Sequence, residues 1–152
     1  MLTSSQKGNL IESHVANMIT LLSDGEIAAS IPIVDDFGID LLLTRKSKYN
    51  TLFFQIKSRF VTGKKNKNGC SFGVKKKGFS AHNRMYILCV YFNQQTEIID
   101  TIWLIPSNEI ESNCIGNLTH RIVASKSPIS KDKWSKYKVT SKQLVDKILN
   151  LI

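Results

Sequence analysis

A mixed α/β domain, in which helices pack against a mixed central sheet, is the fold that this sequence predicts. Near each end of the chain, apolar residues recur at three- and four-residue steps, the spacing of an amphipathic helix. Between these stretches lie short apolar runs bounded by polar, turn-prone residues, which is typical of strands. The 152 residues, 42% of them hydrophobic, suffice for one domain with a core, and no linker divides residues 1–152.

The predicted elements follow in order along the chain. Ser4 or Ser5 caps a first helix, and Asp24-Gly25 ends it. The predicted strands span residues 26–34, 39–44, 51–58, 85–92 and 98–105, and the first three form a meander. A short helical segment is expected at residues 82–84, before the fourth strand. A closing helix begins at Thr140 or at the serine that follows it.

A small group of polar residues interrupts the second and third apolar runs. Gln55 and Lys57 are two residues apart on one strand, so their side chains project from the same face. Asp40 on the neighbouring strand can join them, because residues 45–50 are short enough for a hairpin. Polar groups beside an apolar sheet are costly to bury, and a chemical role is one reason to keep them. The solvated face of an edge strand, with a turn at Gly38, is the alternative explanation.

The order of these residues resembles the PD-(D/E)XK nuclease superfamily. The matching residues are Glu12 on the first helix, Gly38-Ile39-Asp40, and Gln55-Ile56-Lys57 followed by Ser58-Arg59. Gln replaces the commoner Glu, and Gly-Ile-Asp replaces Pro-Asp. Both departures resemble the Gln-x-Lys branch, which includes type IV restriction nucleases and small cyanobacterial homing endonucleases. The resemblance ends near Phe60 and implies a restriction-endonuclease-like αβββαβ core.

The resemblance also implies a set of site residues. Asp40 is then the principal ligand of Mg²⁺, for which Mn²⁺ can substitute, and the Gln55 amide oxygen and the Ile56 carbonyl complete the protein's share. Oxygen ligands of this kind suit either ion. Lys57 would orient or deprotonate the attacking water, and Glu12 would hold a water ligand of the ion or a second ion. The expected catalytic residues are therefore Glu12, Asp40, Gln55 and Lys57.

The charge of the chain favours a polyanionic partner. Lys and Arg number 21 against 12 Asp and Glu, which gives a formal charge of +9 and a pI near 9.6. Double-stranded DNA is the first candidate. A predicted basic loop at residues 63–77 supplies the expected phosphate contacts, which are Lys64, Lys65, Lys67, Lys75, Lys76 and Lys77. Trp134 and Tyr137, set among further lysines, either stack on bases or pin the C-terminal segment to the core.

The cysteines and the apolar runs exclude several other classes of protein. Cys70, Cys89 and Cys114 are odd in number and widely spaced, so neither a zinc site nor a disulfide framework is indicated. Cys89 lies in a hydrophobic run and is expected in the core. We find no signal peptide, and no apolar run approaches the ~20 residues that cross a bilayer. We therefore expect a cytoplasmic protein without a membrane segment.

The sequence thus predicts a metal-dependent DNA endonuclease that hydrolyses phosphodiester bonds, with double-strand cleavage of the homing or restriction type. One small domain engages one DNA strand per active site, so cutting both strands implies a homodimer or a higher homo-oligomer. A Holliday-junction resolvase is the alternative among enzymes. A non-catalytic nucleic-acid-binding module with the same fold is the alternative of another class.

Overall fold

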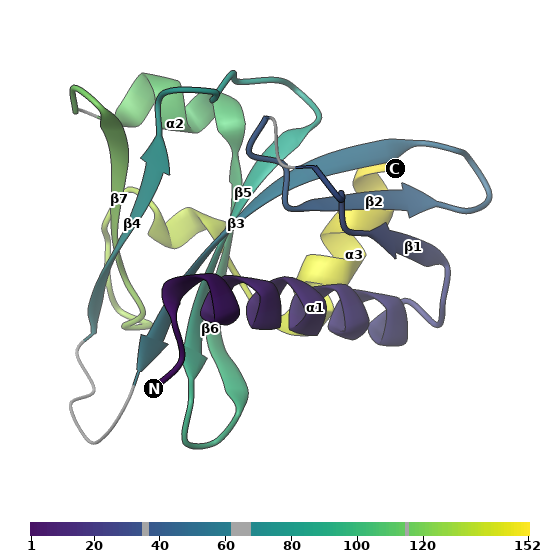
Figure 1. The fold of residues 1–152 in the computed structure, drawn as a ribbon, viewed down its shortest axis with the longest axis horizontal. Coiled ribbons are helices and arrows are strands. Elements are labelled where there is room, and N and C mark those ends of the chain that lie inside the picture. Colours follow the sequence, from purple (N-terminus) through teal and green to yellow (C-terminus); the bar gives the residue numbers. More distant parts are fainter. Residues whose placement is uncertain (35–36, 62–67, 115) are drawn as a thin grey trace.

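The computed structural model describes residues 1–34, 37–61, 68–114 and 116–152 (Figure 1). Along the chain, the elements are α1 (Ser4–Leu22), β1 (Ile27–Ser30), β2 (Leu41–Arg45), β3 (Thr51–Val61), β4 (Gly69–Lys75), β5 (Met85–Asn93), β6 (Ile98–Pro106), α2 (Ser107–Asn113), β7 (Thr119–Ser125), the 3-10 helix η1 (Ser135–Tyr137), β8 (Lys138–Val139) and α3 (Ser141–Leu151).

Six strands form a mixed central sheet in the order β1-β2-β3-β5-β6-β8. The β3–β5 pair is parallel, and the other neighbouring pairs are antiparallel. Strands β4 and β7 form a separate antiparallel sheet of two strands. The predicted fold class, a mixed central sheet flanked by helices, is confirmed, as is the meander of the first three strands.

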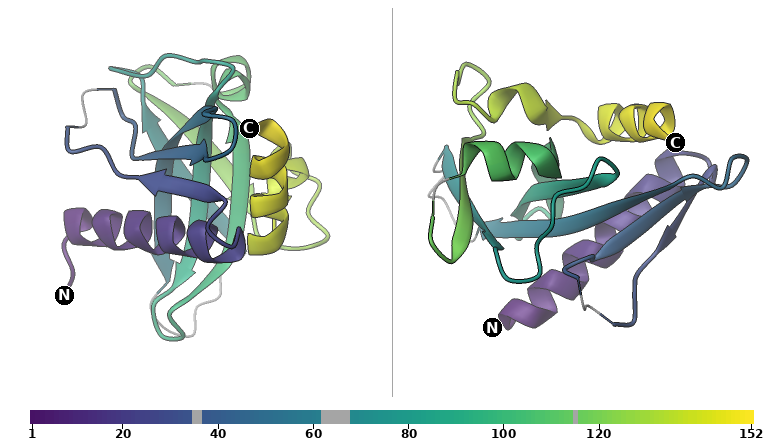
Figure 2. Two further views of the ribbon diagram at one scale, coloured as in Figure 1. Left: turned by 90° about the vertical axis from the view of Figure 1, so that its right-hand side faces the viewer. Right: turned by 90° about the horizontal axis from the view of Figure 1, so that it is seen from above.

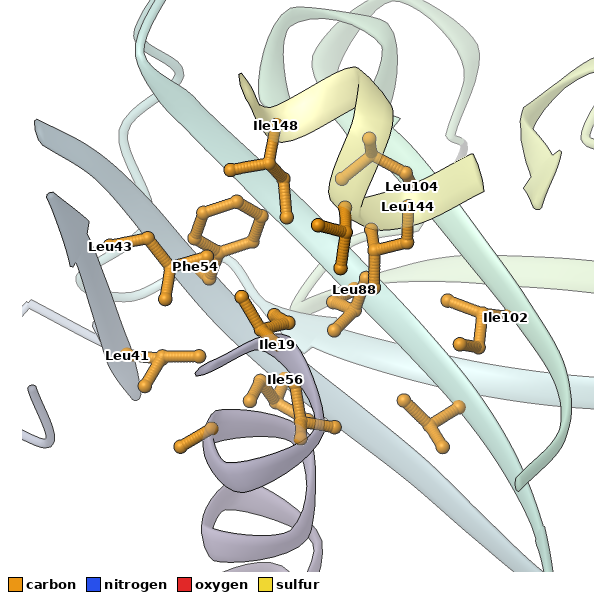
Figure 3. Packing of buried hydrophobic residues seen from close by; sticks show 14 of the residues in the cluster. Ile19, Leu41, Leu43, Phe54, Ile56, Leu88, Ile102, Leu104, Leu144 and Ile148 are labelled. Carbon is orange, nitrogen blue, oxygen red and sulfur yellow. The ribbon is translucent and has the colours of Figure 1, made fainter. Parts of the chain in front are cut away.

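Each face of the central sheet packs into its own hydrophobic cluster. On one face, Phe54 and Ile56 of β3 meet Ile19 of α1 and Ile148 of α3 (Figure 3). On the other face, the β4–β7 sheet, α2 and Trp134 cover β5 and β6. Helices α1 and α3 approach each other at one end of the molecule, away from β7 (Figure 2). Since side chains alternate along β3, Gln55 and Lys57 belong to the second face.

The helix boundaries correct the predicted cap of α1 and confirm the predicted start of α3. Thr3, and not Ser4 or Ser5, caps α1, because its hydroxyl accepts from the Gln6 amide while the Gln6 side chain accepts from the Thr3 amide. Thr140 caps α3 in the same way, and the helix begins at Ser141, one of the two predicted starts. Both helices thus begin with a threonine followed three residues later by glutamine.

The middle of the chain differs from the prediction. The parallel crossover from β3 to β5 contains β4 in place of the helix of an αβββαβ core, and residues 82–84 form a turn in place of a helical segment. Cys70, Phe72 and Val74 are buried on alternate positions, which is the period of a strand. The predicted basic loop at 63–77 is therefore partly strand, while its residues 63–67 lie outside the described part. Strand β1 also ends at Ser30, before the predicted end at residue 34.

Two expectations about the core are confirmed. Trp134 is 1% exposed and packs in the second cluster, so it pins the C-terminal segment to the core. Cys89 is fully buried, and Cys70, Cys89 and Cys114 are all free thiols. Burial raises the pKa of all three, that of Cys70 to about 11. Within the described ranges, no helix is both long enough and apolar enough to cross a membrane.

The Asp132 carboxylate holds together, by hydrogen bonds, the segment that places Trp134 in the core. Asp132 accepts four hydrogen bonds, from the Ser130 and Ser135 hydroxyls and from the backbone amides of Ser125 and Trp134. Partial burial raises the pKa of Asp132, but these hydrogen bonds outweigh it and leave the pKa below its usual value. The folded state therefore favours the ionised carboxylate.

We expect Asp132→Ala to lower the free energy of unfolding by about 2–4 kcal/mol, because several donors lose a charged acceptor at once. Because the folded pKa is lowered, the stabilisation is present above the unfolded pKa of about 3.9 and disappears as the pH falls through the folded value. Urea unfolding of both proteins at pH 7 and in acid checks this. Asp146→Ala, on the exposed side of α3, is the matched control. If the free energy of unfolding at pH 7 falls equally in Asp132→Ala and Asp146→Ala, the proposed role of Asp132 is wrong.

Candidate active site

The predicted site lies where the pairing of β2 with β3 stops. The two strands pair only as far as Leu41 opposite Phe54, and the Asp40 amide donates to the Phe54 carbonyl at 2.8 Å. The next amide on this edge of β3, that of Ile56, donates to the Asp40 Oδ2 atom at 2.6 Å. The N–H and C=O of one strand residue point to the same side, so the Ile56 carbonyl also faces this edge. The Asp40 carboxylate and the Ile56 carbonyl are thus neighbours.

The Gln55 side chain is buried without a complete set of partners. It is 9% exposed, and its Oε1 atom has no hydrogen-bond partner within the part of the chain that the structure describes. An amide oxygen buried in this way costs free energy unless some group satisfies it. A cation beside the sheet is one group that would do so.

Gly38 makes the close packing of Gln55 possible. Its φ of +66° is in the left-handed region, and a Cβ atom there would lie 2.6 Å from the Gln55 Nε2 atom. Any larger residue is therefore both strained and in collision with the amide. Gly38 was not among the predicted site residues; the signal in the sequence was its place two residues before Asp40.

Lys57 lies two residues beyond Gln55 on the same face of β3 and is half-buried. Burial raises the pKa of the neighbouring Cys89 thiol well above its usual value, and the positive charge of Lys57 opposes that shift. The lysine is therefore close to the core of the second cluster. The structure brings together three predicted residues along β3, at positions 55, 56 and 57, with Asp40 at their edge.

Glu12 lies on α1, which packs on the other face of the sheet from Gln55 and Lys57. It is half-buried on α1, next to Ile11, which packs in the first cluster with Ile56. Leu10 and His14 lie on the opposite flank of α1 and line a cavity of about 440 Å³ at the far end of β3. Glu12 therefore lies on the flank of α1 away from that cavity.

The predicted DNA-binding lysines fall into two groups. Lys64, Lys65 and Lys67 lie outside the described residues, and Lys75, Lys76 and Lys77 are exposed at the end of β4. The segment after Lys77 lies against the segment that carries Gly38. Their shared cavity has a volume of about 420 Å³ and is lined by Phe37, Ile39 and Phe53 on one side and by Gly78, Ala81 and His82 on the other.

The expected ligands are all oxygen atoms, the donor type that a hard cation takes. Among the described residues, no three His, Cys, Asp or Glu side chains gather as a metal site. The expected ligands are two carboxylates, those of Asp40 and Glu12, together with the Gln55 amide oxygen and the Ile56 carbonyl. Oxygen donors with few charges are typical of Mg²⁺, which keeps several of its waters.

The chain resembles a known protein in structure and not in sequence. No family model matches the chain, and no curated protein matches it in sequence. A solved structure of a bacterial homing endonuclease, I-Ssp6803I, superposes with a TM-score of 0.62 at 15% sequence identity, over 99% of this chain and 97% of that chain. The chain therefore shares the fold of a homing endonuclease along nearly its whole length.

Proposed function

We propose that this protein is a metal-dependent DNA endonuclease that hydrolyses phosphodiester bonds. The observation that carries the proposal is the buried Gln55 amide oxygen, which has no partner among the described residues and lies on the strand whose Ile56 amide holds Asp40. The endonuclease fold of the structural neighbour supports it. Assignment to the Gln-x-Lys branch of the PD-(D/E)XK superfamily is part of the same proposal.

Each site residue has a distinct task in this reaction. Asp40, Gln55 and the Ile56 carbonyl hold a divalent ion at the edge of β3. The ion supplies Lewis-acid polarisation of the scissile phosphate. Lys57 orients the attacking water, and its charge stabilises the transition state as negative charge builds on the phosphate oxygens. Glu12 accepts a hydrogen bond from a water at the rim of the site and fixes its position.

The proposed substrate is duplex DNA. The formal charge of +9 favours a polyanion, and Lys75, Lys76 and Lys77 are exposed directly before Gly78, which lines a cavity together with Phe37 and Ile39. Cleavage of both strands requires two active sites, so the proposal includes a homodimer or a higher homo-oligomer.

Incubation of the purified protein with linear duplex and with a four-way junction tests the proposal. We expect cleavage of the linear duplex in Mg²⁺ or Mn²⁺ and none in EDTA. Cleavage confined to the four-way junction would instead identify a junction resolvase. DNA binding without cleavage in any divalent ion would identify a non-catalytic module.

Gln55→Glu is expected to tighten the binding of Mn²⁺ by about tenfold, because a second negative ligand joins the site. Titration calorimetry of the two proteins without DNA measures this directly. Gln95→Glu adds the same charge in the exposed turn after β5 and should leave the affinity unchanged. Equal affinities in wild type and Gln55→Glu would show that Gln55 does not face the ion.

A further inference from the structure

The β4–β7 sheet buries one of its faces and leaves the other open. Seven residues of each strand pair in register, from Gly69 opposite Ser125 to Lys75 opposite Thr119. The inner face is buried against the central sheet and consists of Cys70, Phe72, Val74, His120, Ile122 and Ala124. The alternate residues of both strands therefore form an outer face that no described element covers.

The outer face is basic. Lys75 and Arg121 lie on it, Lys76 and Lys77 continue from its end, and neither strand contains Asp or Glu. No hydrogen bond or ion pair holds the Arg121 guanidinium among the residues that the structure describes. The charge of this face therefore complements a polyanion.

The pairing across the two strands leaves Arg121 free to reach outward. Its partner is Gly73, which has no side chain to cover the guanidinium. Val123, which is 59% exposed, lies beside it with Ser71 as its partner. The outer face thus offers a guanidinium fork, a hydroxyl and an exposed aliphatic group side by side. These are the groups that read guanine edges and thymine methyl groups in DNA.

The sheet also has the dimensions of a groove-reading element. Two paired strands lie about 4.8 Å apart, and the major groove of B-DNA, about 12 Å wide, admits a two-stranded ribbon. The outer face of β4 projects little above its backbone, because its residues there include Gly69, Ser71 and Gly73, which have small side chains or none. A wider sheet or a row of large side chains would not enter the groove.

The position of the sheet relates it to the candidate active site. Its inner face packs against Phe53 and Val61 of β3, on the same face of the central sheet as Gln55 and Lys57. Strands β4 and β7 lie side by side, and β4 contacts β3 (Figure 1). A duplex held at the candidate active site therefore passes close to this sheet.

We propose that the outer face of the β4–β7 sheet enters the major groove of duplex DNA and that Arg121 reads a guanine there through its N7 and O6 atoms. The inference rests on the proposed nuclease function and adds the source of its sequence preference. Arg121 is then a specificity-determining residue, with no part in the hydrolysis itself.

Selection of bound sequences from a pool of random duplexes, without divalent ions, tests the inference in the full-length protein. Wild type should enrich a motif that contains guanine, and replacement of that guanine by 7-deazaguanine should weaken binding. Arg121→Ala should lose the preference at that position by about 5- to 100-fold. Arg121→Lys keeps the charge without the fork, so it should lose the preference and keep the salt dependence of binding. Lys147→Ala, on α3, is the control and should enrich the wild-type motif.

The possible results separate this inference from the proposed function. If wild type cleaves DNA but the Arg121 variants enrich the wild-type motif, the nuclease stands and the role of Arg121 is wrong. Enrichment of no motif by wild type also overturns it. If Arg121→Ala changes the oligomeric state alone, the outer face binds a second copy and not DNA. Melting temperatures of the variants close to that of wild type show that these effects do not come from unfolding.

Discussion

Asp40→Asn and Lys57→Ala are each expected to slow Mg²⁺-dependent DNA cleavage by about a thousandfold or more. Asp40→Asn removes the charge that holds the ion, yet its amide oxygen still accepts from the Ile56 amide. The edge of β3 should therefore keep its geometry. Lys57→Ala removes the charge that stabilises the transition state. Most of the DNA affinity comes from phosphate contacts elsewhere, so binding should change by less than about threefold.

Single-turnover cleavage and equilibrium binding, measured on the same duplex, separate the two effects. Lys147→Ala removes a lysine from the exposed surface of α3 and should cleave at the wild-type rate. A Lys57→Ala protein that also cleaves at the wild-type rate would remove Lys57 from the active site. Loss of both cleavage and binding in Asp40→Asn would indicate a role in DNA binding.

Gly38→Ala is expected to lower the cleavage rate by about a hundredfold, although no group that contacts the substrate is removed. The new Cβ atom would lie 2.6 Å from the Gln55 Nε2 atom, so the amide must leave its place beside the ion. The left-handed backbone at Gly38 adds strain of about 1–2 kcal/mol. The variant should therefore bind Mn²⁺ more weakly and also unfold more easily.

Gly78→Ala is the matched control for this change. Gly78 has a φ of +84°, but nothing lies within 4 Å of a Cβ atom built there, so its substitution brings the strain without the collision. It should lose stability and keep its Mn²⁺ affinity. In the double variant Gly38→Ala with Gln55→Ala, the collision is absent and part of the stability should return. Unchanged Mn²⁺ affinity in Gly38→Ala would contradict the proposed place of Gln55.

The elements that were predicted well carry their signal in local sequence. The apolar run of β5 and the three- and four-residue spacing of apolar residues in α1 and α3 follow from their own residues, and so does the hairpin of β2 and β3. The order of Glu12, Asp40, Gln55 and Lys57 also stands in the sequence. The mixed sheet could therefore be predicted, and the site residues could be proposed before their geometry was known.

The elements that were missed depend on partners distant in sequence. Strand β4 contains two glycines and pairs with β7, which begins 44 residues after β4 ends, so its short alternation has no local support. Likewise, the unpaired state of the Gln55 oxygen depends on where β2 ends beside β3. Neither fact can be read from a run of neighbouring residues. The crossover strand and the burial of Gln55 thus required the tertiary structure.

Strand β3 pairs with β5 beyond the point where its pairing with β2 ends, and this difference affects local motion. At Ile56 the strand has β5 as its parallel neighbour on one side, while on the other its amide is bonded to the Asp40 carboxylate. Amides of Gln55 and Lys57 face the interior ladder, and their exchange with solvent requires β3 to separate from β5. The Ile56 amide is released as soon as Asp40 moves. One backbone proton therefore reports the position of the carboxylate, independently of the stability of the sheet around it.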